Sequence, residues 1–241
     1  IFIEHATGLN VITGGYGGLG GLWEDPMEHP RGPELKNRVV WAPHYYPDIY
    51  PTPGFNAEPR RFTAEQVRYR NYEPKIREAM GLAKYSLGNI PTVFGEFGTY
   101  FNYNNTYTRD KDTGNLKLVN KSKADNYIVS SHIFNNYFEA MERVFASRIL
   151  WCYSSENTET HGDLWNREDF SVLGPDRKPR SELAWSRPYA RALAGKPVST
   201  YFHSDFHYFD PAKGTANAKR EFMVRYASKE SSAPTEIFVP K

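Results

Sequence analysis

A glutamate flanked by glycines is the residue of this sequence best suited to chemistry. Glu96 lies in Pro91-Thr-Val-Phe-Gly-Glu-Phe-Gly98, where the apolar run before it predicts a short strand. In parallel α/β barrels, residues at the carboxyl ends of strands point into the active-site mouth. The flanking glycines would let other groups approach closely, so Glu96 is a candidate nucleophile. A strand-end glutamate that only hydrogen-bonds the next loop is the alternative.

A histidine and a tyrosine end the preceding predicted strand. Trp41-Ala-Pro-His-Tyr-Tyr46 places the imidazole of His44 and the phenol of Tyr46 at the level of Glu96. A phenol beside a carboxylate can orient it and hold it ionised through a hydrogen bond. A core aromatic cluster that includes a hydrogen-bonded histidine would explain the same residues.

A tryptophan ends the next predicted strand, in Leu150-Trp151-Cys-Tyr153, and could form the floor on which a sugar ring stacks. The loop that follows, 161–171, is rich in polar groups and adds Asp163, Trp165 and Glu168. Carboxylates and amides beside aromatic faces are typical of carbohydrate sites. A surface loop that caps a helix is the competing interpretation, so we take Asp163 and Glu168 as either substrate-contacting or structural.

Short apolar strands alternate with amphipathic helices over the first three quarters of the chain, which predicts βα units and a parallel sheet. After about residue 187 short β-rich runs divided by polar turns predict an antiparallel β domain. We expect strands at 1–5, 38–44, 92–97 and 147–153, helices at 74–86 and 124–147, a capping box at Thr63–Gln66, a hairpin at 105–120, and later strands at 199–209, 222–226 and 235–239.

Composition excludes several classes of function. The formal net charge of +2 gives no electrostatic reason to expect nucleic-acid binding. No apolar run approaches the roughly 20 residues that span a bilayer. The single cysteine, Cys152, excludes an intrachain disulfide framework and a multi-cysteine metal site. Two sequons, at Asn104 and Asn120, leave the compartment open between secretory and cytoplasmic.

Two further patterns carry little weight. The run Gly14–Gly21 contains a literal GxGxxG, but Pro26, Pro30 and Pro33 follow where a dinucleotide site needs a helix, so a surface loop is favoured. His203, Asp205 and His207 alternate along a predicted strand, and this alternation explains them better than a metal hydrolase does. We therefore expect no metal and no cofactor.

Together, the three strand ends and the loop 161–171 resemble glycoside hydrolase family 5, and more narrowly its endoglycoceramidase-related branch. The motifs are Ala42–Tyr46, Gly95–Gly98 and His161–Ser171, with Arg187-Pro-Tyr189 ahead of a β domain. The resemblance implies an α/β fold. Residues 1–186 would form the C-terminal half of a (β/α)8 TIM barrel, about strands 5–8. Residues 187–241 would begin a small, truncated antiparallel β-sandwich domain.

The resemblance also implies a retaining β-glycosidase, whose chemistry needs two carboxyl groups about 5–5.5 Å apart. Glu96 would be the nucleophile, Tyr46 its hydrogen-bond donor and His44 a contact to the sugar or the acid/base. Trp151 would line the subsite of the cleaved sugar, and Asp163 and Trp165 are further candidate substrate contacts. The usual Asn-Glu acid/base motif is absent from the sequence. Glu4 is expected to support the site, with the acid/base role as its alternative.

The expected partner is a carbohydrate or glycolipid such as glucosylceramide or a steryl glucoside, which allows transient contact with a membrane surface; no obligate protein partner is evident. Because Ile1–Glu4 looks like the middle of a strand, we expect a piece of a longer enzyme that is poorly stable and inactive alone. An endo-β-glucanase or mannanase of the same family and a non-catalytic, carbohydrate-binding degenerate barrel remain as alternatives.

Overall fold

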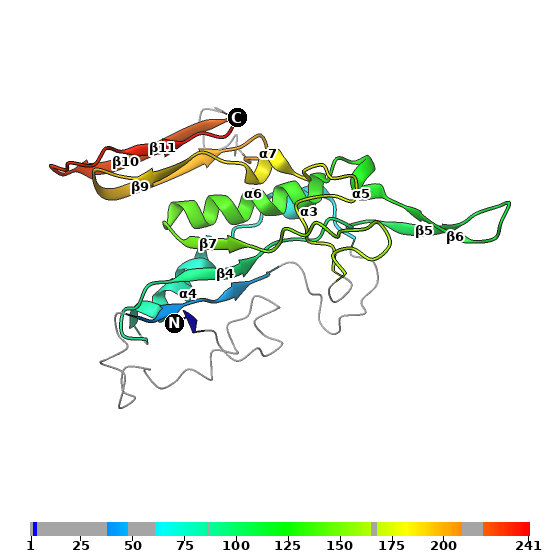
Figure 1. The fold of residues 1–241 in the computed structure, drawn as a ribbon, viewed down its shortest axis with the longest axis horizontal. Helices are drawn as coiled ribbons and strands as arrows, with labels where there is room; N and C mark the ends of the chain where they lie inside the picture. Colours follow the sequence, from blue (N-terminus) through cyan, green and yellow to red (C-terminus); the bar gives the residue numbers. More distant parts are fainter. Residues whose placement is uncertain (1, 4–37, 48–60, 86, 165–167, 209–218) are drawn as a thin grey trace.

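Short parallel strands lie at the centre of the computed structural model, which describes residues 2–3, 38–47, 61–85, 87–164, 168–208 and 219–241 (Figure 1). The strands are β1 (Phe2–Ile3), β2 (Val40–Trp41), β3 (His44–Tyr45), β4 (Val93–Phe97) and β7 (Ser147–Leu150). β1 pairs with β2, and β4 lies between β3 and β7 in a second sheet; all three pairings are parallel. The four predicted parallel strands are confirmed over their described residues.

A proline divides the second predicted strand into β2 and β3. Pro43 has no N–H to donate to a ladder, so regular pairing stops there. Its carbonyl oxygen nevertheless accepts a hydrogen bond from Gly95 N at 2.9 Å, and Trp41 N donates to Pro91 O at 2.8 Å. A parallel bridge between Trp41 and Thr92 completes the contact. Both halves of the divided strand therefore run beside β4.

Helices α4 (Glu73–Tyr85) and α6 (Ile128–Arg143) connect successive parallel strands, as the alternation of strands and helices predicted. Helix α3 (Ala64–Arg68) begins with the predicted capping box, in which the side chains of Thr63 and Gln66 accept each other's backbone N–H. No helix in the described part of the chain is long and apolar enough to cross a membrane.

The helix predicted over 124–147 is shorter and interrupted. Within the predicted range α6 covers only Ile128–Arg143, and the separate short helix α5 (Lys121–Ala124) precedes it, with a break between them at Asn126 and Tyr127. These residues have φ angles of 50° and 54°, in the left-handed region that a right-handed helix cannot pass through. Phe145 adopts a φ of 54° just beyond the end of α6. Local backbone reversals therefore set both ends of α6.

Aromatic side chains fill the core between the sheet and α6. Tyr45 of β3 makes edge-on contacts with Tyr72 and with Tyr137 of α6, at centroid distances of 5.9 and 5.8 Å. The Tyr137 hydroxyl donates to Tyr45 O at 3.1 Å, so its polar end is satisfied in the interior. Phe97 of β4 packs on the same tyrosine at 5.3 Å. These residues belong to the aromatic 15% of the sequence, much of which is thus core material.

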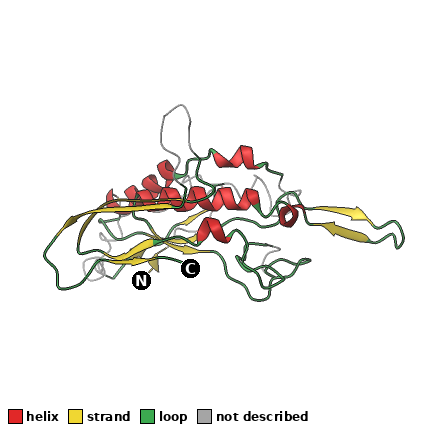
Figure 2. Ribbon diagram, turned by 90° about the horizontal axis from the view of Figure 1, so that it is seen from above, coloured by secondary structure: helices red, strands yellow, loops and turns green. Residues whose placement is uncertain are grey.

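A long hairpin projects from the connection between β4 and α6 (Figures 1 and 2). Its strands are β5 (Thr106–Arg109) and β6 (Leu116–Val119), paired antiparallel as predicted. Asp110 organises the turn, since its carboxylate accepts hydrogen bonds from the backbone and side chain of Thr113 and from Asp112 N. The same hydrogen bonds, led by that from Thr113 N, lower the pKa of Asp110.

The C-terminal part is antiparallel, as predicted, in two pairs of strands: β9 with β10 and β8 with β11. Short helix α7 precedes these strands. The elements are α7 (Glu182–Trp185), β8 (Tyr189–Ala192), β9 (Gly195–His203), β10 (Glu221–Ser228) and β11 (Glu236–Phe238). In Figure 1 α6 lies between the β9–β10 pair and the parallel sheet.

A buried ion pair joins α6 to the chain just before β8. Both carboxylate oxygens of Glu142 accept hydrogen bonds from the Arg187 guanidinium, at 2.7 and 2.8 Å. The two side chains are 8% and 2% exposed. Arg187 also donates to Asn135 Oδ1 and to Phe202 O of β9. This network ties the antiparallel strands to the α/β part of the chain.

Replacing Glu142 by Gln leaves the buried Arg187 without its counter-charge, which costs about 3–5 kcal/mol in comparable pairs. We therefore expect E142Q to lower the free energy of unfolding by that amount in urea denaturation. The matched control is E236Q, because Glu236 pairs with Arg191 at 3.3 Å with side chains 46% and 74% exposed. Such an exposed pair contributes about 0–1 kcal/mol. Equal effects of the two substitutions would contradict the role assigned to the buried pair.

Candidate functional site

Glu96, His44 and Tyr46 meet at the carboxyl ends of β3 and β4. His44 lies opposite Glu96 in the parallel register. The Tyr46 hydroxyl donates to Glu96 Oε2 at 2.8 Å, and His44 Nδ1 lies 3.3 Å from the same oxygen. Two neighbouring side chains therefore hold one oxygen of the carboxylate, and the structure joins three residues that the sequence predicted at neighbouring strand ends.

The carboxylate is held but accessible. The side chain of Glu96 is 29% exposed and that of His44 is 20% exposed, whereas Tyr46 as a whole is only 6% exposed. A nucleophile must reach its substrate from a defined orientation. The buried phenol supplies the orientation, and the partial exposure of Glu96 supplies the access.

Two glycines allow β4 to approach its neighbours closely. A Cβ on Gly95 would lie 3.2 Å from Ala42 O and 3.3 Å from the His44 ring. A Cβ on Gly98 would lie 2.0 Å from the carbonyl oxygen of Trp151. Trp151 N donates to Phe97 O at 2.9 Å, and the Trp151–Cys152 peptide bond is cis. Glycine at position 98 thus lets Trp151 sit directly beside the strand that carries Glu96.

A methyl group at Gly98 has no room, so we expect G98A to displace the Trp151 backbone and to destabilise the fold by about 1–3 kcal/mol, the usual cost of overpacking. The comparison is G81A in α4, where the added Cβ would meet nothing closer than the Tyr85 ring at 3.9 Å. There, alanine should stabilise the helix by up to about 1 kcal/mol. Urea denaturation of both variants measures the difference, and a neutral G98A would disprove the close approach.

Asp163 organises the loop that follows β7. Its two carboxylate oxygens accept hydrogen bonds from Asn157 Nδ2 at 2.7 Å, from Phe170 N at 2.5 Å and from Ser171 N at 3.1 and 3.2 Å. The thiol of Cys152 lies 3.6 Å away, and burial together with the charge of Asp163 raises the pKa of that thiol. Of the two roles predicted for Asp163, these bonds support the structural one. A direct substrate contact stays a prediction.

Phe170 is a supporting residue that sequence reasoning missed. It is fully buried, packs edge-on against Tyr46 at a centroid distance of 5.8 Å, and packs with a tilted ring against Tyr100 at 4.3 Å. The neighbouring Asp169 forms a 2.7 Å ion pair with Arg180, which fixes the loop. The sequence did contain a signal for Phe170: it is an apolar residue within a polar loop, and such a residue usually points into the core. Phe170 therefore supports the phenol that holds Glu96.

The other predicted site residues divide into two groups. Glu168 is buried, at 6% exposure, and its carbonyl oxygen accepts a hydrogen bond from Asp163 N at 2.8 Å, so it belongs to the loop's framework. Glu4 and Trp165 lie outside the described residues, as does the glycine run 14–21. Their predicted roles stay predictions.

The strand predicted over 199–209 is too long, because β9 ends at His203 and both Asp205 and His207 lie beyond it, so these residues do not alternate along a strand. They have other partners. The rings of His203 and His207 stack at 3.9 Å, and His207 Nδ1 lies 2.6 Å from Glu139 Oε1 of α6. Asp205 instead forms an ion pair with Arg220 at 2.9 Å. Among the residues that the structure describes, no group of three His, Cys, Asp or Glu side chains is arranged to hold a metal ion.

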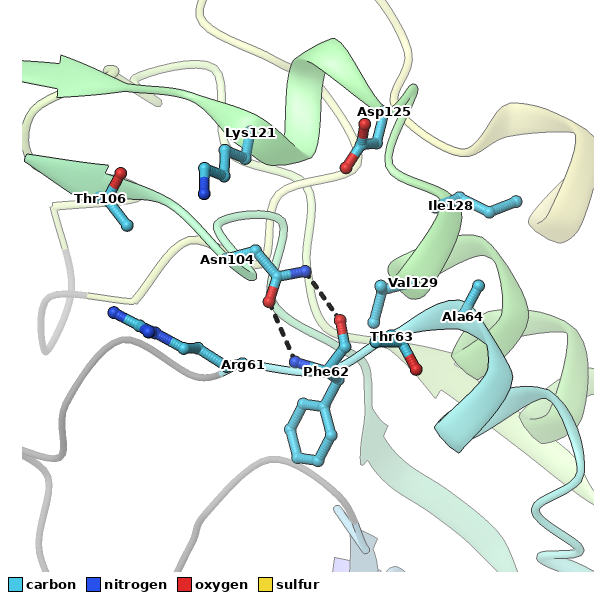
Figure 3. A pocket seen from close by; sticks show the side chains of 10 residues that line it. All are labelled: Arg61, Phe62, Thr63, Ala64, Asn104, Thr106, Lys121, Asp125, Ile128 and Val129. Atoms are coloured by element: carbon cyan, nitrogen blue, oxygen red, sulfur yellow. Dashed lines mark hydrogen bonds between the residues drawn. The ribbon is translucent and has the colours of Figure 1, made fainter.

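A separate cavity of about 430 Å³ lies between the start of α3 and the base of the hairpin (Figure 3). Asn104 joins the two segments, because its amide accepts a hydrogen bond from Phe62 N at 3.0 Å and donates one to Phe62 O at 2.7 Å. Arg61 and Lys121 contribute positive charge to the lining and Asp125 negative charge. The double hydrogen bond fixes the base of the hairpin to the body of the protein.

Curated relatives of this chain have the names of glycosidases. It is 26% identical over 198 residues to a glucosylceramidase of Rhizopus delemar, an alignment that covers 71% of this chain and 25% of the relative. It is 27% identical over 188 residues to a glucosylceramidase of Cryptococcus neoformans, covering 71% and 23%. With the ergosteryl-β-glucosidase of Saccharomyces cerevisiae it shares 35% identity over 106 residues, or 44% and 12%. The chain thus spans about a quarter or less of each relative's length.

Solved structures show the same fold. Sterylglucosidase 1 of Cryptococcus neoformans superposes with a TM-score of 0.63 at 20% identity, over 90% of this chain and 33% of that one. A second structure of that protein gives a TM-score of 0.50 at 23% identity, over 68% and 25%. No family model matches the chain. The α/β arrangement seen here is therefore shared with part of a larger protein.

Proposed function

We propose that this chain carries the nucleophile of a retaining β-glycosidase that hydrolyses glycolipids such as glucosylceramide or a steryl glucoside. The observation that carries the proposal is the Glu96 carboxylate, held at Oε2 by Tyr46 and His44 at the end of a parallel strand and left partly exposed. The names of the curated relatives support the substrate class.

In this proposal Glu96 attacks the anomeric carbon of the sugar. Tyr46 engages Oε2, so Oε1 is the oxygen to approach the substrate. The phenol fixes the rotamer of the carboxylate, which places the attacking oxygen before the substrate binds. The bond to the aglycone breaks as the covalent glycosyl-enzyme forms, and the aglycone oxygen takes a proton from the acid/base carboxyl group. Water, which gives a proton back to that group, then releases the sugar with its configuration retained. His44 and Trp151 would contact the sugar beside the nucleophile.

The proposed fold is the C-terminal half of a (β/α)8 barrel in residues 1–186, with a β-sandwich domain beginning at 187. The order of parallel strands, each followed by a helix or loop, supports this assignment. Retaining chemistry also needs an acid/base carboxyl group about 5–5.5 Å from the nucleophile. We assign that role to none of the described residues. Unless Glu4, which lies outside the described residues, fills it, we propose that residues 1–241 alone are inactive.

Replacing Glu96 by Ala in a protein that carries this sequence and cleaves an aryl β-glucoside should lower kcat by about 10⁴-fold or more, since the covalent step is lost. Added azide should restore turnover by occupying the vacated space, and the product should be the α-glucosyl azide, identified by NMR. Glu78→Ala, on the exposed side of α4, is the control and should leave the rate unchanged.

Formation of the β-glucosyl azide by the Glu96 variant would instead identify Glu96 as the acid/base. An unchanged rate for the Glu96 variant would refute both roles.

Tyr46→Phe removes one hydroxyl and keeps the buried ring. The loss of the 2.8 Å hydrogen bond frees the Glu96 rotamer, so we expect kcat to fall by about tenfold to a hundredfold with little change in KM. Tyr85→Phe is the matched control, because Tyr85 is 78% exposed on α4. Steady-state kinetics on the aryl β-glucoside separate the two. Equal kcat values for both variants would show that the phenol does not position the nucleophile.

A further inference from the structure

The hairpin β5–β6 exposes large apolar side chains far from the core. Tyr107 is 63% exposed and Leu116 is 68% exposed. In both ribbon views the hairpin extends beyond the rest of the described chain (Figures 1 and 2). An isolated two-stranded hairpin in water is marginal, so exposed leucine and tyrosine on such an element require an explanation.

The apolar side chains share one face of the hairpin. Tyr107 lies opposite Leu118, and Arg109 lies opposite Leu116. Because side chains alternate along a strand, these two cross-strand pairs point to the same side. The pair Thr108–Lys117 points to the other side. We call Tyr107, Arg109, Leu116 and Leu118 the hairpin face.

The hairpin carries three cations and two turn carboxylates, Asp110 and Asp112, so its net charge is +1, with the cations placed around the hairpin face. Arg109 lies within it, Lys111 lies in the turn and Lys117 lies on the reverse side. The carboxylate of Asp110 is turned into the loop, where it accepts hydrogen bonds from Thr113 and Asp112. The projecting hairpin thus combines tyrosine, leucine and long cationic side chains. Such side chains bind at the boundary between lipid head groups and acyl chains.

We propose that the hairpin face inserts into the surface of a membrane containing anionic lipid and holds the enzyme against its glycolipid substrate. Tyr107, Leu116 and Leu118 would enter the acyl boundary, while Arg109, Lys111 and Lys117 would pair with lipid phosphates and carboxylates. Each cation near an anionic surface strengthens such binding. The inference deepens the proposed function and rests on it for the identity of the substrate.

A membrane fits the hairpin face better than a protein partner does. A stable protein interface buries about 1,200–2,000 Å², far more than two exposed side chains and one half-buried leucine provide. Pairing of strand edges between two copies is opposed by Lys117, since charged side chains on an edge strand discourage it. A bilayer needs only shallow insertion of a few side chains with cations around them.

The position of the hairpin also suits this role. It is inserted after the carboxyl end of β4, the same strand end that carries Glu96. Its base is fixed by the double hydrogen bond between Asn104 and Phe62 and by Ser122, whose N–H donates to Asn105 Oδ1 at 3.1 Å. The hairpin that would bind the membrane is therefore continuous in sequence with the strand that carries Glu96, and its base is anchored to the body of the protein.

Vesicle binding tests the inference directly. A protein that carries this sequence is sedimented with vesicles of phosphatidylcholine alone or of phosphatidylcholine and phosphatidylserine at about four to one. The double substitution Y107S/L116S should weaken binding to the mixed vesicles by about tenfold or more, because two inserting side chains are lost. The matched control is Y85S/L183S, which makes the same changes at side chains that are 78% and 51% exposed on α4 and α7.

R109Q/K111Q should remove the preference for the mixed vesicles. Equal binding by Y107S/L116S and Y85S/L183S would overturn the inference, as would failure of the unaltered protein to bind either vesicle. The mass of the protein without vesicles is measured by analytical ultracentrifugation. If Y107S/L116S lowers this mass and leaves vesicle binding unchanged, the hairpin face binds a second copy of the chain and the inference is wrong.

Hydrolysis separates this inference from the proposed function. Y107S/L116S should keep the rate on a soluble aryl β-glucoside and lose about tenfold on a steryl glucoside embedded in the mixed vesicles. If the unaltered protein cleaves neither substrate while vesicle binding still depends on the hairpin face, the proposed function fails and the membrane contact stands. If both substrates are cleaved equally well by the variant and the unaltered protein, the membrane contact has no part in catalysis and the inference fails.

Discussion

The parallel register between β3 and β4 is the constraint on which the candidate site depends. It sets His44 opposite Glu96 and carries Tyr46, two residues further on, into hydrogen-bonding distance of the same carboxylate. A slip of one residue would turn the side chains of one strand to the opposite face and separate all three groups. The absence of a side chain at Gly95 lets the two strands stay in this register, because a larger residue would press on the His44 ring.

The body of the protein holds that register from both sides of β4. On one side Tyr45 and Phe97, which alternate with the site residues along their strands, pack against Tyr137 of α6. On the other side the loop after β7 brings Phe170 against Tyr46, and Asp163 holds that loop through backbone hydrogen bonds. Side chains of the candidate site and of the core therefore alternate on the same strands, so packing of the core and positioning of the carboxylate depend on each other.

Sequence reasoning found the strands and the meeting of Glu96, His44 and Tyr46, because apolar runs mark strands and strand ends of a parallel sheet lie at one edge. It did not find the ion pair of Glu142 with Arg187, since residues far apart in sequence leave no periodic signal when only one contact joins them. The break at Tyr127 was also missed, because a tyrosine with positive φ is held by its surroundings and not by its own preference. Tertiary contacts decided each feature that the local pattern did not contain.

The segment between β4 and β5 links the site to the hairpin mechanically. The Thr99 and Tyr103 side chains share a 3.0 Å hydrogen bond in the interior, and Ser130 of α6 donates to Tyr100 O at 2.7 Å. Asn104 then ties the chain to Phe62 before the hairpin begins. A segment that is buried and hydrogen-bonded along its length keeps a defined conformation, whereas an exposed linker opens easily. The base of the hairpin is therefore fixed relative to the strand that carries Glu96, so the proposed membrane contact and the candidate site lie on one continuously bonded segment.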